Sequence, residues 1–390
     1  MTMDIAALRR DTPACAGVVH FNNAGAALPP AVVVDTVVDH LRREAAIGGY
    51  EAEAEAGERL EAVYGSIARL IGAAPDEIAQ VESATRAWDM AFYSLRFGPG
   101  DRILTARAEY ASNYIAFLQM ARRTGAEIVP IPSDESGAVS LPELDRLLDE
   151  RVKLIAVTHI PTSGGLINPA EEIGRRARSA GVPFLLDACQ SVGQLPIDVE
   201  AIGCDMLSAT GRKYLRGPRG TGFLYVRRAL LERLEPPFLD LHAACWTAPD
   251  RYELRPDARR FESWESHVAG RLGLGAAVDY ALRLGLPAIR DRVCALAERL
   301  RARLAELPGV AVRDLGKRRC GIVTFTREGE DAAAVKARLG AQAIHVSVST
   351  ASGTLLDFEA RGIPDLVRAS VHYYNDEPEI DRFVAALAAA

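Results

Sequence analysis

The sequence contains little cysteine and no long apolar run. Its 390 residues include six cysteines, and none of these forms a Cys-x-x-Cys pair. We therefore expect neither a metal site of the zinc type nor a disulfide framework. The polar residues 1–11 lack the apolar core of a signal peptide, and apolar stretches such as residues 31–38 are far shorter than a membrane span. These features predict a cytoplasmic protein with no membrane attachment.

An excess of positive charge is also missing. The formal net charge is -6 at pH 7, so the chain lacks the positive field that attracts nucleic acid or anionic membrane. We expect no nucleic-acid partner, and the arginine-rich residues 251–260 are interpreted as solvated faces. Hydrophobic residues make up 49% and charged residues 25%, as is ordinary for a globular protein.

Short strand patterns alternate with helical patterns through the middle of the chain. Strands are predicted at residues 102–105, 127–131, 154–158, 184–186 and 223–226, and helices at 112–123, 141–149 and 170–179, with two more helices within 33–71. This alternation predicts an α/β fold whose mainly parallel sheet carries helices on both faces.

From about residue 261 the pattern changes to two long helices followed by a mixed α+β region. Helices are predicted at 267–284, 288–307, 331–339 and 377–388, and strands at 310–313, 321–326 and 366–370. We therefore expect three parts: residues 1–30 as an N-terminal segment associated with a small domain, residues 31–260 as a large domain, and residues 261–390 as that small domain.

The most informative stretch is residues 184–225. A buried-strand pattern ends in Asp187, where an open α/β sheet lines its ligand crevice, although a helix N-cap would also explain this aspartate. Thr210, Arg212 and Lys213 then precede a glycine-rich turn, which suits a phosphate. Lys213 is alternatively the amine that attacks an aldehyde covalently, and a basic surface hairpin is the plainer interpretation.

Several ordered motifs resemble one enzyme family. The run from Asp187-Ala188-Cys189-Gln190 to Thr210-Gly211-Arg212-Lys213 resembles the signature of class V aminotransferase-type enzymes, which use pyridoxal 5′-phosphate (PLP). Residues 21–25 resemble the family's opening motif, and residues 368–370 with 375–377 resemble its closing motif. The family includes cysteine desulfurases, cystine and cysteine-conjugate C–S lyases, isopenicillin N epimerase-like proteins and the sulfoxide lyase of ergothioneine biosynthesis.

The resemblance covers nearly the whole chain and implies several properties. The fold would be the PLP-dependent transferase fold type I, with a seven-stranded sheet in the large, PLP-binding domain. The protein would be a homodimer acting on a small amino acid. Lys213 would hold PLP as a Schiff base and move the substrate Cα proton. Asp187 would pair with the pyridine nitrogen, and Gln190 would hydrogen-bond the ring oxygen.

The resemblance also implies residues that bind the phosphate and the ring. Ala84 and Thr85 would open a helix whose N-terminus holds the phosphate, completed by Thr210 and by Arg212, where the family usually has histidine. Two further residues lie near the ring: Tyr110 would stack on it, unless it is a packed core tyrosine, and Thr162 stands where many relatives have asparagine.

Three residues are implied in substrate binding: Arg368, Asn23 and Glu265. Arg368 would grip the α-carboxylate, although a salt-bridged strand arginine is the commoner case. Glu265 stands where the family has a threonine that reaches the phosphate of the neighbouring subunit's cofactor, so that contact is lost or passes to Ser263 or Ser266. The adjacent Trp264 faces the substrate or anchors a dimer interface.

The sequence departs from the desulfurases in one region. Their mobile cysteine precedes the closing motif, but residues 346–356 contain no cysteine, and Cys320 is interpreted as a small apolar residue. Gly48-Gly49-Tyr50 resembles the ergothioneine-pathway branch, or is simply a helix-ending glycine pair. We expect C–S lyase activity by β-elimination, with epimerisation or transamination as alternatives. A desulfurase or a catalytically silent scaffold is disfavoured.

Overall fold

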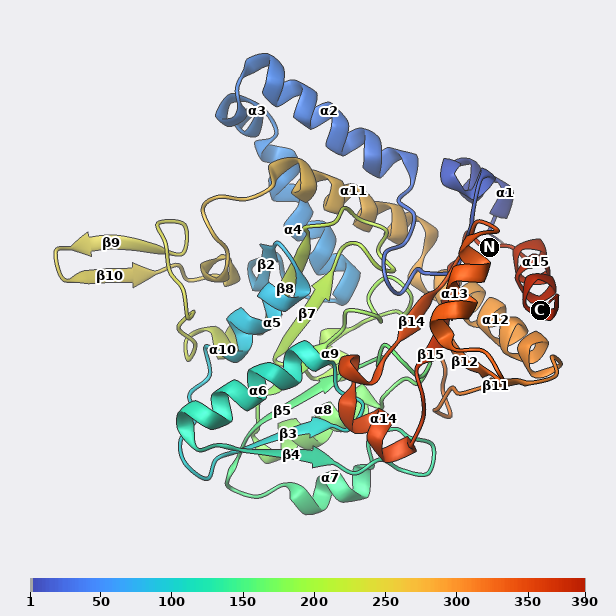
Figure 1. Ribbon diagram of the computed structural model, residues 1–390. Helices are drawn as coiled ribbons and strands as arrows, with labels where there is room; N and C mark the ends of the chain where they lie inside the picture. Colours follow the sequence, from blue (N-terminus) through green and yellow to red (C-terminus); the bar gives the residue numbers. More distant parts are fainter. Residues whose placement is uncertain (1–2, 390) are drawn as a thin grey trace.

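A seven-stranded sheet forms the centre of the molecule (Figure 1). This computed structural model describes residues 3–389. The strands are β2 (Ile78–Val81), β3 (Arg102–Ala106), β4 (Glu127–Ile131), β5 (Val152–Thr158), β6 (Phe184–Asp187), β7 (Met206–Thr210) and β8 (Gly222–Val226). They lie in the order β2-β8-β7-β6-β5-β3-β4, and β8 runs antiparallel to both of its neighbours while the remaining pairs are parallel. The predicted α/β fold is confirmed.

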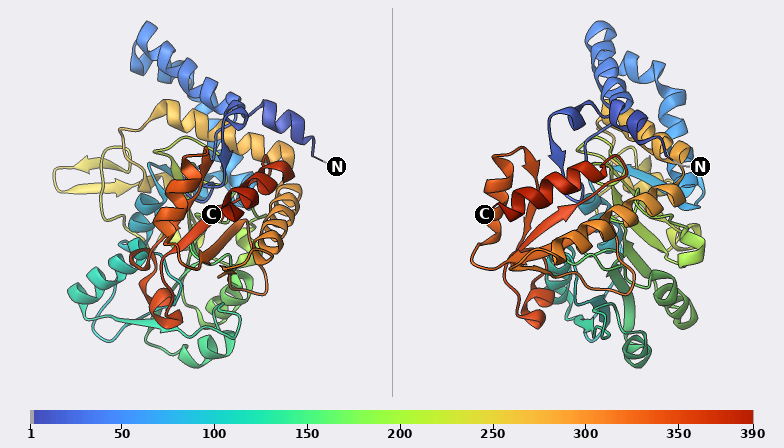
Figure 2. Two further views of the ribbon diagram at one scale, coloured as in Figure 1. Left: turned by 45° about the vertical axis from the view of Figure 1, so that its right-hand side comes forward. Right: turned by 90° about the vertical axis from the view of Figure 1, so that its right-hand side faces the viewer.

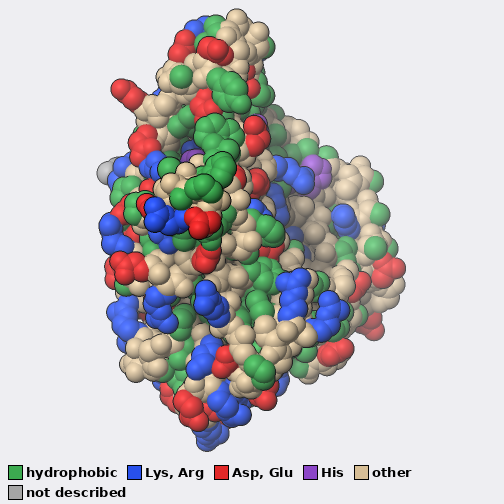
Figure 3. Space-filling view, turned by 90° about the vertical axis from the view of Figure 1, so that its left-hand side faces the viewer, with side chains coloured by type: hydrophobic (Ala, Val, Ile, Leu, Met, Phe, Trp, Pro, Cys, Tyr) green, Lys and Arg blue, Asp and Glu red, His purple; other side chains and the backbone are tan. Residues whose placement is uncertain are grey.

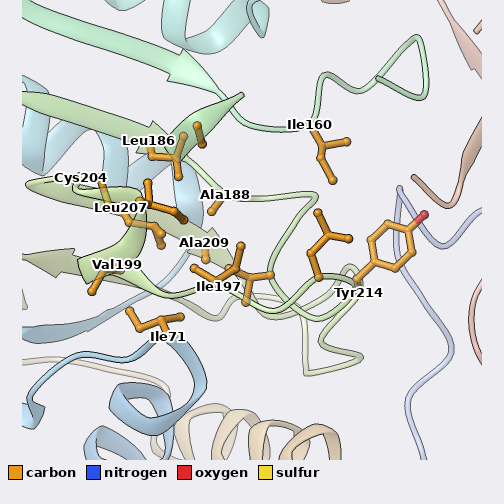
Figure 4. Packing of buried hydrophobic residues seen from close by; sticks show 14 of the residues in the cluster. Ile71, Ile160, Leu186, Ala188, Ile197, Val199, Cys204, Leu207, Ala209 and Tyr214 are labelled. Carbon is orange, nitrogen blue, oxygen red and sulfur yellow. The ribbon is translucent and has the colours of Figure 1, made fainter. Parts of the chain in front are cut away.

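Helices cover both faces of this sheet because its strands are apolar on both sides. On β6, Leu186 packs into one core cluster and Leu185 into the other. Figure 4 shows Leu186 with Leu207 and Ala209 of β7 in the first cluster. Helices α4 (Gly57–Ile71), α7 (Leu141–Leu147), α8 (Ala170–Ala180), α9 (Val199–Ile202) and α11 (Val268–Leu284) supply the first face, and α5 (Ala84–Phe92), α6 (Ala111–Thr124) and α10 (Arg228–Leu231) the second.

A four-stranded antiparallel sheet forms a second layer in the C-terminal part (Figure 2). Its order is β11 (Val310–Val312), β12 (Ile322–Arg327), β15 (Leu366–Ser370) and β14 (Ser347–Ser349). The neighbouring helices are α12 (Leu286–Ala305), α13 (Ala332–Gly340), α14 (Leu355–Arg361) and α15 (Glu377–Ala388). A third core cluster lies between the sheet and α12, α13 and α15.

The N-terminal segment lies against this C-terminal part. After α1 (Ile5–Arg10), strand β1 (Val19–His20) pairs in parallel with β13 (Ile344–His345), and Asn22 bridges to Ser370 of β15. The contact places residues 19–22 beside the strand that carries Arg368. The predicted limits of the three domains, residues 1–30, 31–260 and 261–390, stay a prediction.

Some elements differ from the sequence expectations. The two helices expected within residues 33–71 are three, α2 (Ala31–Ile47), α3 (Gly49–Glu55) and α4, because Gly48 at φ 104° breaks the chain direction. Strand β7 and the hairpin of β9 (Ala244–Ala248) with β10 (Arg251–Leu254) were not predicted. Within the expected solvated stretch, Arg260 is buried and donates to the carbonyls of Leu231 and Leu234.

Among residues 3–389, no single helix is long and apolar enough to cross a membrane. Helices α11 and α12 reach that standard only when they are counted together across a bend of 82°.

Candidate active site

Asp187 lies at the carboxyl end of β6, in the centre of the sheet. Its Oδ2 accepts a hydrogen bond of 2.9 Å from Asn113 Nδ2, and its Oδ1 accepts one of 2.9 Å from the backbone N–H of Cys189. The segment that follows is a turn rather than a helix, so the helix N-cap interpretation is wrong. Each carboxylate oxygen keeps a lone pair that a ligand N–H group can use.

A second buried carboxylate, Glu109, lies one hydrogen-bond bridge away and was missed from the sequence. Asn113 Nδ2 donates to Glu109 Oε1 at 2.9 Å as well as to Asp187. Burial, with the nearby charge of Asp187, raises the pKa of Glu109 to about 7, against the hydrogen bonds that lower it. The signal in the sequence was an acidic residue three positions after the buried strand β3 and four positions before the amide that it holds.

Lys213 lies on the turn that follows β7. Burial lowers the pKa of its ammonium group, and the positive charges of Arg212 and Arg368 lower it further, while Cys189 and Asp187 act in the opposite sense. Within residues 3–389, the Lys213 ammonium group forms no ion pair or hydrogen bond, and Asp187 acts on it only through its charge. A lysine with a lowered pKa and no fixed partner is suited to act as a nucleophile and as a base.

The N-terminus of α5 faces the glycine turn between β7 and β8. Ser83 caps the helix by accepting from Arg86 N at 3.2 Å, and Ala84 and Thr85 form the first turn. A Cβ atom on Gly222 would lie 3.1 Å from Ala84 N, so glycine is what allows β8 to approach this helix end. The free N–H groups there form an anion site of the kind that holds a phosphate.

The predicted phosphate contacts of Thr210 and Arg212 stay predictions. Thr210 Oγ1 lies 3.4 Å from the carbonyl of Thr221 and is buried. Arg212 Nη1 donates to the carbonyl of Gly25, so a phosphate contact would have to use its other nitrogen atoms. Arg212 thereby ties the turn that carries Lys213 to the N-terminal segment.

Arg368, Thr162 and Gln190 form a connected group of hydrogen-bonded side chains. Arg368 Nη1 donates to Thr162 Oγ1 at 2.5 Å, and Gln190 Nε2 donates to the same oxygen at 3.3 Å. Arg368 Nε and Gln190 Oε1 are both buried without a partner. The free atom of Gln190 is thus an acceptor, so the predicted bond to a ring oxygen requires Nε2 to leave Thr162.

The structure corrects the prediction for Asn23 as a substrate-binding residue. Asn23 is 0% exposed, its Nδ2 donates to the carbonyls of His20 and Ser370, and its Oδ1 accepts from Tyr374. Both N–H groups of the amide are thus used and the side chain has no exposed surface for a ligand to reach. The adjacent Asn22 lies nearer to the site instead, with its Oδ1 3.4 Å from Arg368 Nη2.

The remaining two predicted residues lie at the surface. Tyr110 is 40% exposed, immediately before α6, which excludes the packed core alternative and leaves its ring free to cover a ligand. Glu265 lies beside Glu82 and Thr221 in a small cavity at the phosphate end, not beside Arg368. A contact between Glu265 and substrate bound to the same subunit is therefore not supported.

The residues present fit PLP in their chemistry. A buried aspartate with free lone pairs suits the pyridine N–H, the free helix N-terminus suits the phosphate, and Lys213 has no competing partner. Arg368 is a buried cation with an unused nitrogen and, among residues 3–389, no acidic partner, which is what a substrate carboxylate requires.

Comparisons with known proteins show the family and the fold of the chain. A family model described as aminotransferase class-V matches residues 19–383. A probable cysteine desulfurase of Methanothermobacter thermautotrophicus is 30% identical over 379 residues, which cover 96% of this chain and 94% of that protein. The apo structure of a cysteine desulfurase from Thermococcus onnurineus NA1 has a TM-score of 0.93 at 28% identity and covers 100% of this chain and 99% of its own.

A structure of a cystine C–S lyase with its reaction product cysteine persulfide has the same fold. Its TM-score is 0.87 at 24% identity, over 97% of this chain and 99% of that one. At this identity the likeness concerns the fold alone.

Proposed function

The chain belongs to the class V aminotransferase family of PLP-dependent enzymes, and we propose that it is a C–S lyase acting on a cysteine-derived amino acid. The reaction would break the Cβ–S bond by β-elimination and yield pyruvate, ammonia and a sulfur species. One observation carries the choice of reaction: the region before Arg368 that spans β14 and α14 contains no cysteine to accept sulfur.

The cysteines elsewhere do not replace it. Cys320 is fully buried, and burial raises the pKa of its thiol to about 12, so it is a poor nucleophile. The exposed Cys245 lies on the β9–β10 hairpin, which projects to the left in Figure 1, away from the C-terminal part that carries Arg368. Cys189 lies beside Asp187 and Lys213, but burial raises the pKa of its thiol, so it too is a poor nucleophile. A sulfur atom released at the site therefore has no reactive thiol of the same subunit beside it, which favours its release into solution.

The residues of the site divide the work by position. When bound, PLP supplies an electron sink that stabilises negative charge at the substrate Cα. Arg368 would hold the substrate carboxylate and so fix which Cα bond faces Lys213. The amine of Lys213, with its lowered pKa, would take the proton from Cα. Asp187 would hold the ring N–H, which keeps the pyridine nitrogen protonated.

We propose a homodimer and take the projecting hairpin as its contact. Trp246 on β9 is 81% exposed and Tyr252 on β10 is also exposed, as are Phe238 and Leu241 before the hairpin. Figure 3 shows the side of the molecule to which the hairpin points, with hydrophobic side chains grouped among charged ones. Aromatic residues so exposed are typical of protein interfaces. A cytoplasmic location stays a prediction.

The experiment is a substrate panel with purified enzyme and PLP. Cystine, cysteine S-conjugates and cysteine sulfoxides are offered, and pyruvate and the sulfur product are measured by coupled assay and mass spectrometry. We expect pyruvate in equal amount to the sulfur species from at least one of them, and none with Lys213→Ala. Alanine formed from cysteine would instead indicate a desulfurase.

Two other results would overturn the proposal. Deuterium entering Cα from solvent without pyruvate indicates epimerisation, and consumption of a 2-oxo acid indicates transamination. If the Lys213→Ala variant kept full turnover, the proposal that Lys213 is the catalytic lysine would be wrong.

A further inference from the structure

Glu109 collects hydrogen bonds from three separate elements. It accepts from Thr105 Oγ1 at 3.2 Å on β3, from Thr158 N at 3.1 Å and the Thr158 hydroxyl on β5, and from Tyr110 N and Asn113 Nδ2, both at 2.9 Å, at the start of α6. These donors occupy the lone pairs of both carboxylate oxygens. Glu109 therefore has no capacity left to contact a ligand.

Asp187 differs from Glu109 in this respect. It accepts from two protein donors and keeps free lone pairs. Asn113 connects the two carboxylates, because its amide group has two hydrogens and donates one to each. The amide can face Asp187 as a donor only in this orientation, and the bond to Glu109 fixes it.

We infer that Glu109 is a positioning residue, which sets the orientation of Asp187 through Asn113 and holds the backbone of Tyr110. Asp187 is the residue proposed to hold the pyridine nitrogen of PLP, and Tyr110 is the residue proposed to cover the pyridine ring. This inference rests on the proposed placement of the cofactor, but it does not depend on which bond of the substrate breaks.

The chemistry of the donors requires Glu109 to be a carboxylate rather than an amide. The backbone N–H groups of Tyr110 and Thr158 are donors that cannot reverse, one on each oxygen of Glu109, and the Asn113 amide donates only while its Nδ2 faces Glu109. Glutamine at this position would turn its own NH₂ group towards at least one of them, and Asn113 would then rotate its oxygen towards Asp187. The ring contact of Asp187 is expected to weaken even though the shape of the side chain is kept.

The test uses PLP binding to the full chain, which reads the site without any substrate. Apo-protein is prepared from the holoenzyme, and the dissociation constant is measured by PLP titration for wild type, Glu109→Gln, Asn113→Ala and the double variant. We expect each single variant to weaken binding about 10-fold. The double variant should lose little more than either single one, because both changes break the same connection.

The visible absorption band of the bound cofactor gives a second readout. This band changes with pH as the bound cofactor gains or loses a proton. Replacing Glu109 by glutamine removes a negative charge that favours the protonated cofactor, so the midpoint of this change should move to lower pH. A residue that only supported the fold would lower the melting temperature without moving this midpoint.

Asp205→Asn is a matched control. Asp205 is a partly buried carboxylate that accepts from Phe184 N at 2.9 Å, at the opposite end of β6, and burial raises its pKa also. We expect the dissociation constant of the Asp205→Asn variant for PLP to stay within about twofold of wild type. The pH midpoint of its absorption band should not move, while its melting temperature falls.

The outcomes separate this inference from the proposed site. If Asp187→Asn binds PLP as tightly as wild type, the placement of the cofactor is wrong. If Asp187→Asn weakens binding but Asn113→Ala and Glu109→Gln do not, or if the losses of these two simply add, the positioning role of Glu109 is wrong. Should Glu109→Gln fail to fold, Asn113→Ala decides by the same affinity and pH midpoint.

Discussion

Arg368 Nη1 donates a 2.5 Å hydrogen bond to Thr162 Oγ1, and this neutral hydroxyl is the strongest contact that the guanidinium makes among residues 3–389. Burial lowers the pKa of Arg368, which means that the fold pays in free energy for keeping a charge there. A buried charge is normally paired. The missing partner is therefore expected to arrive with the substrate.

Replacing Arg368 by methionine should separate activity from stability. We expect kcat/KM to fall about 100-fold, since two charge-assisted bonds to a carboxylate are lost. The free energy of unfolding should not decrease, because a buried unpaired charge is removed. Steady-state kinetics and urea unfolding measure the two effects, and a large loss of stability would show that the charge is paired structurally.

Arg301 is the matched control for that experiment. It is also a buried arginine of the C-terminal part, but its Nε pairs with Asp314 at 2.6 Å. Arg301→Met leaves that acid uncompensated and should destabilise the fold by about 3–5 kcal/mol. The opposite signs of the two stability changes test the interpretation of Arg368 as a ligand-binding charge.

Alkylation of the accessible thiol should leave the lyase reaction intact. Of the six cysteines, Cys245 is the exposed one, so iodoacetamide should label it first, and the buried thiols react slowly because burial raises the pKa of Cys15 to about 11 and that of Cys320 to about 12. Peptide mapping follows the label while pyruvate release is measured. Loss of sulfur release in proportion to Cys245 labelling, absent in Cys245→Ser, would point to thiol transfer.

Local pattern in the sequence located Asp187 at the end of an apolar strand and Lys213 before a glycine turn, where the structure also has them. Their roles at a PLP site came from the family resemblance and stay predictions. The strand-helix alternation predicted the α/β sheet, because burial on both faces leaves an apolar run in most of its strands. Strand β7, whose five residues include Ser208 and Thr210, lacks such a run and was missed.

What could not be predicted are relationships between residues far apart in the chain. Asn23 and Asn22 are adjacent in an extended segment, and which of them faces the site depends on the pairing of that segment with Ser370. Glu109 reaches Asp187 through a fold contact across 74 residues between Asn113 and Asp187. Neither the orientation of the two asparagines nor the bridge from Glu109 to Asp187 can be recognised from the spacing or periodicity of the sequence.

Arg216 connects the turn that carries Lys213 to the N-terminal segment. It is fully buried at φ 62°, and it donates to Leu28 O at 2.7 Å, to Tyr373 Oη at 2.8 Å and to Thr12 Oγ1 at 2.5 Å. Arg216→Ala should destabilise the fold by about 3 kcal/mol, since buried acceptors lose a charged donor. Limited proteolysis should also cut residues 3–30 faster than in wild type.

Arg216→Gly separates the backbone from the side chain. Glycine relieves the left-handed conformation but loses the same donors. It should thus be less destabilised than Arg216→Ala, while the N-terminal segment is cut as quickly. Equal protease resistance of both variants and wild type would show that Arg216 does not anchor that segment.

Acid should destabilise the apo-protein through His159, at the carboxyl end of β5. Burial, with a smaller effect from the charge of Arg318, lowers the pKa of His159 to about 4 from its usual 6.5. Above pH 6.5 both folded and unfolded states hold the neutral ring, so stability is unaffected. As pH falls from 6.5 towards 4 only the unfolded state takes the proton, and the free energy of unfolding should fall by about 3 kcal/mol.

Glu109 has the opposite effect to His159 on the free energy of unfolding, over an overlapping pH range. Its pKa is raised to about 7 from 4.5, so between these values the unfolded state is the more ionised, and stability rises as pH falls from 7 towards 4.5. The two groups partly cancel in wild type. Urea unfolding at pH 4.5 to 7.5 should therefore show a steeper acid loss in Glu109→Gln and a reversed slope in His159→Gln; parallel curves for all three proteins would contradict both assignments.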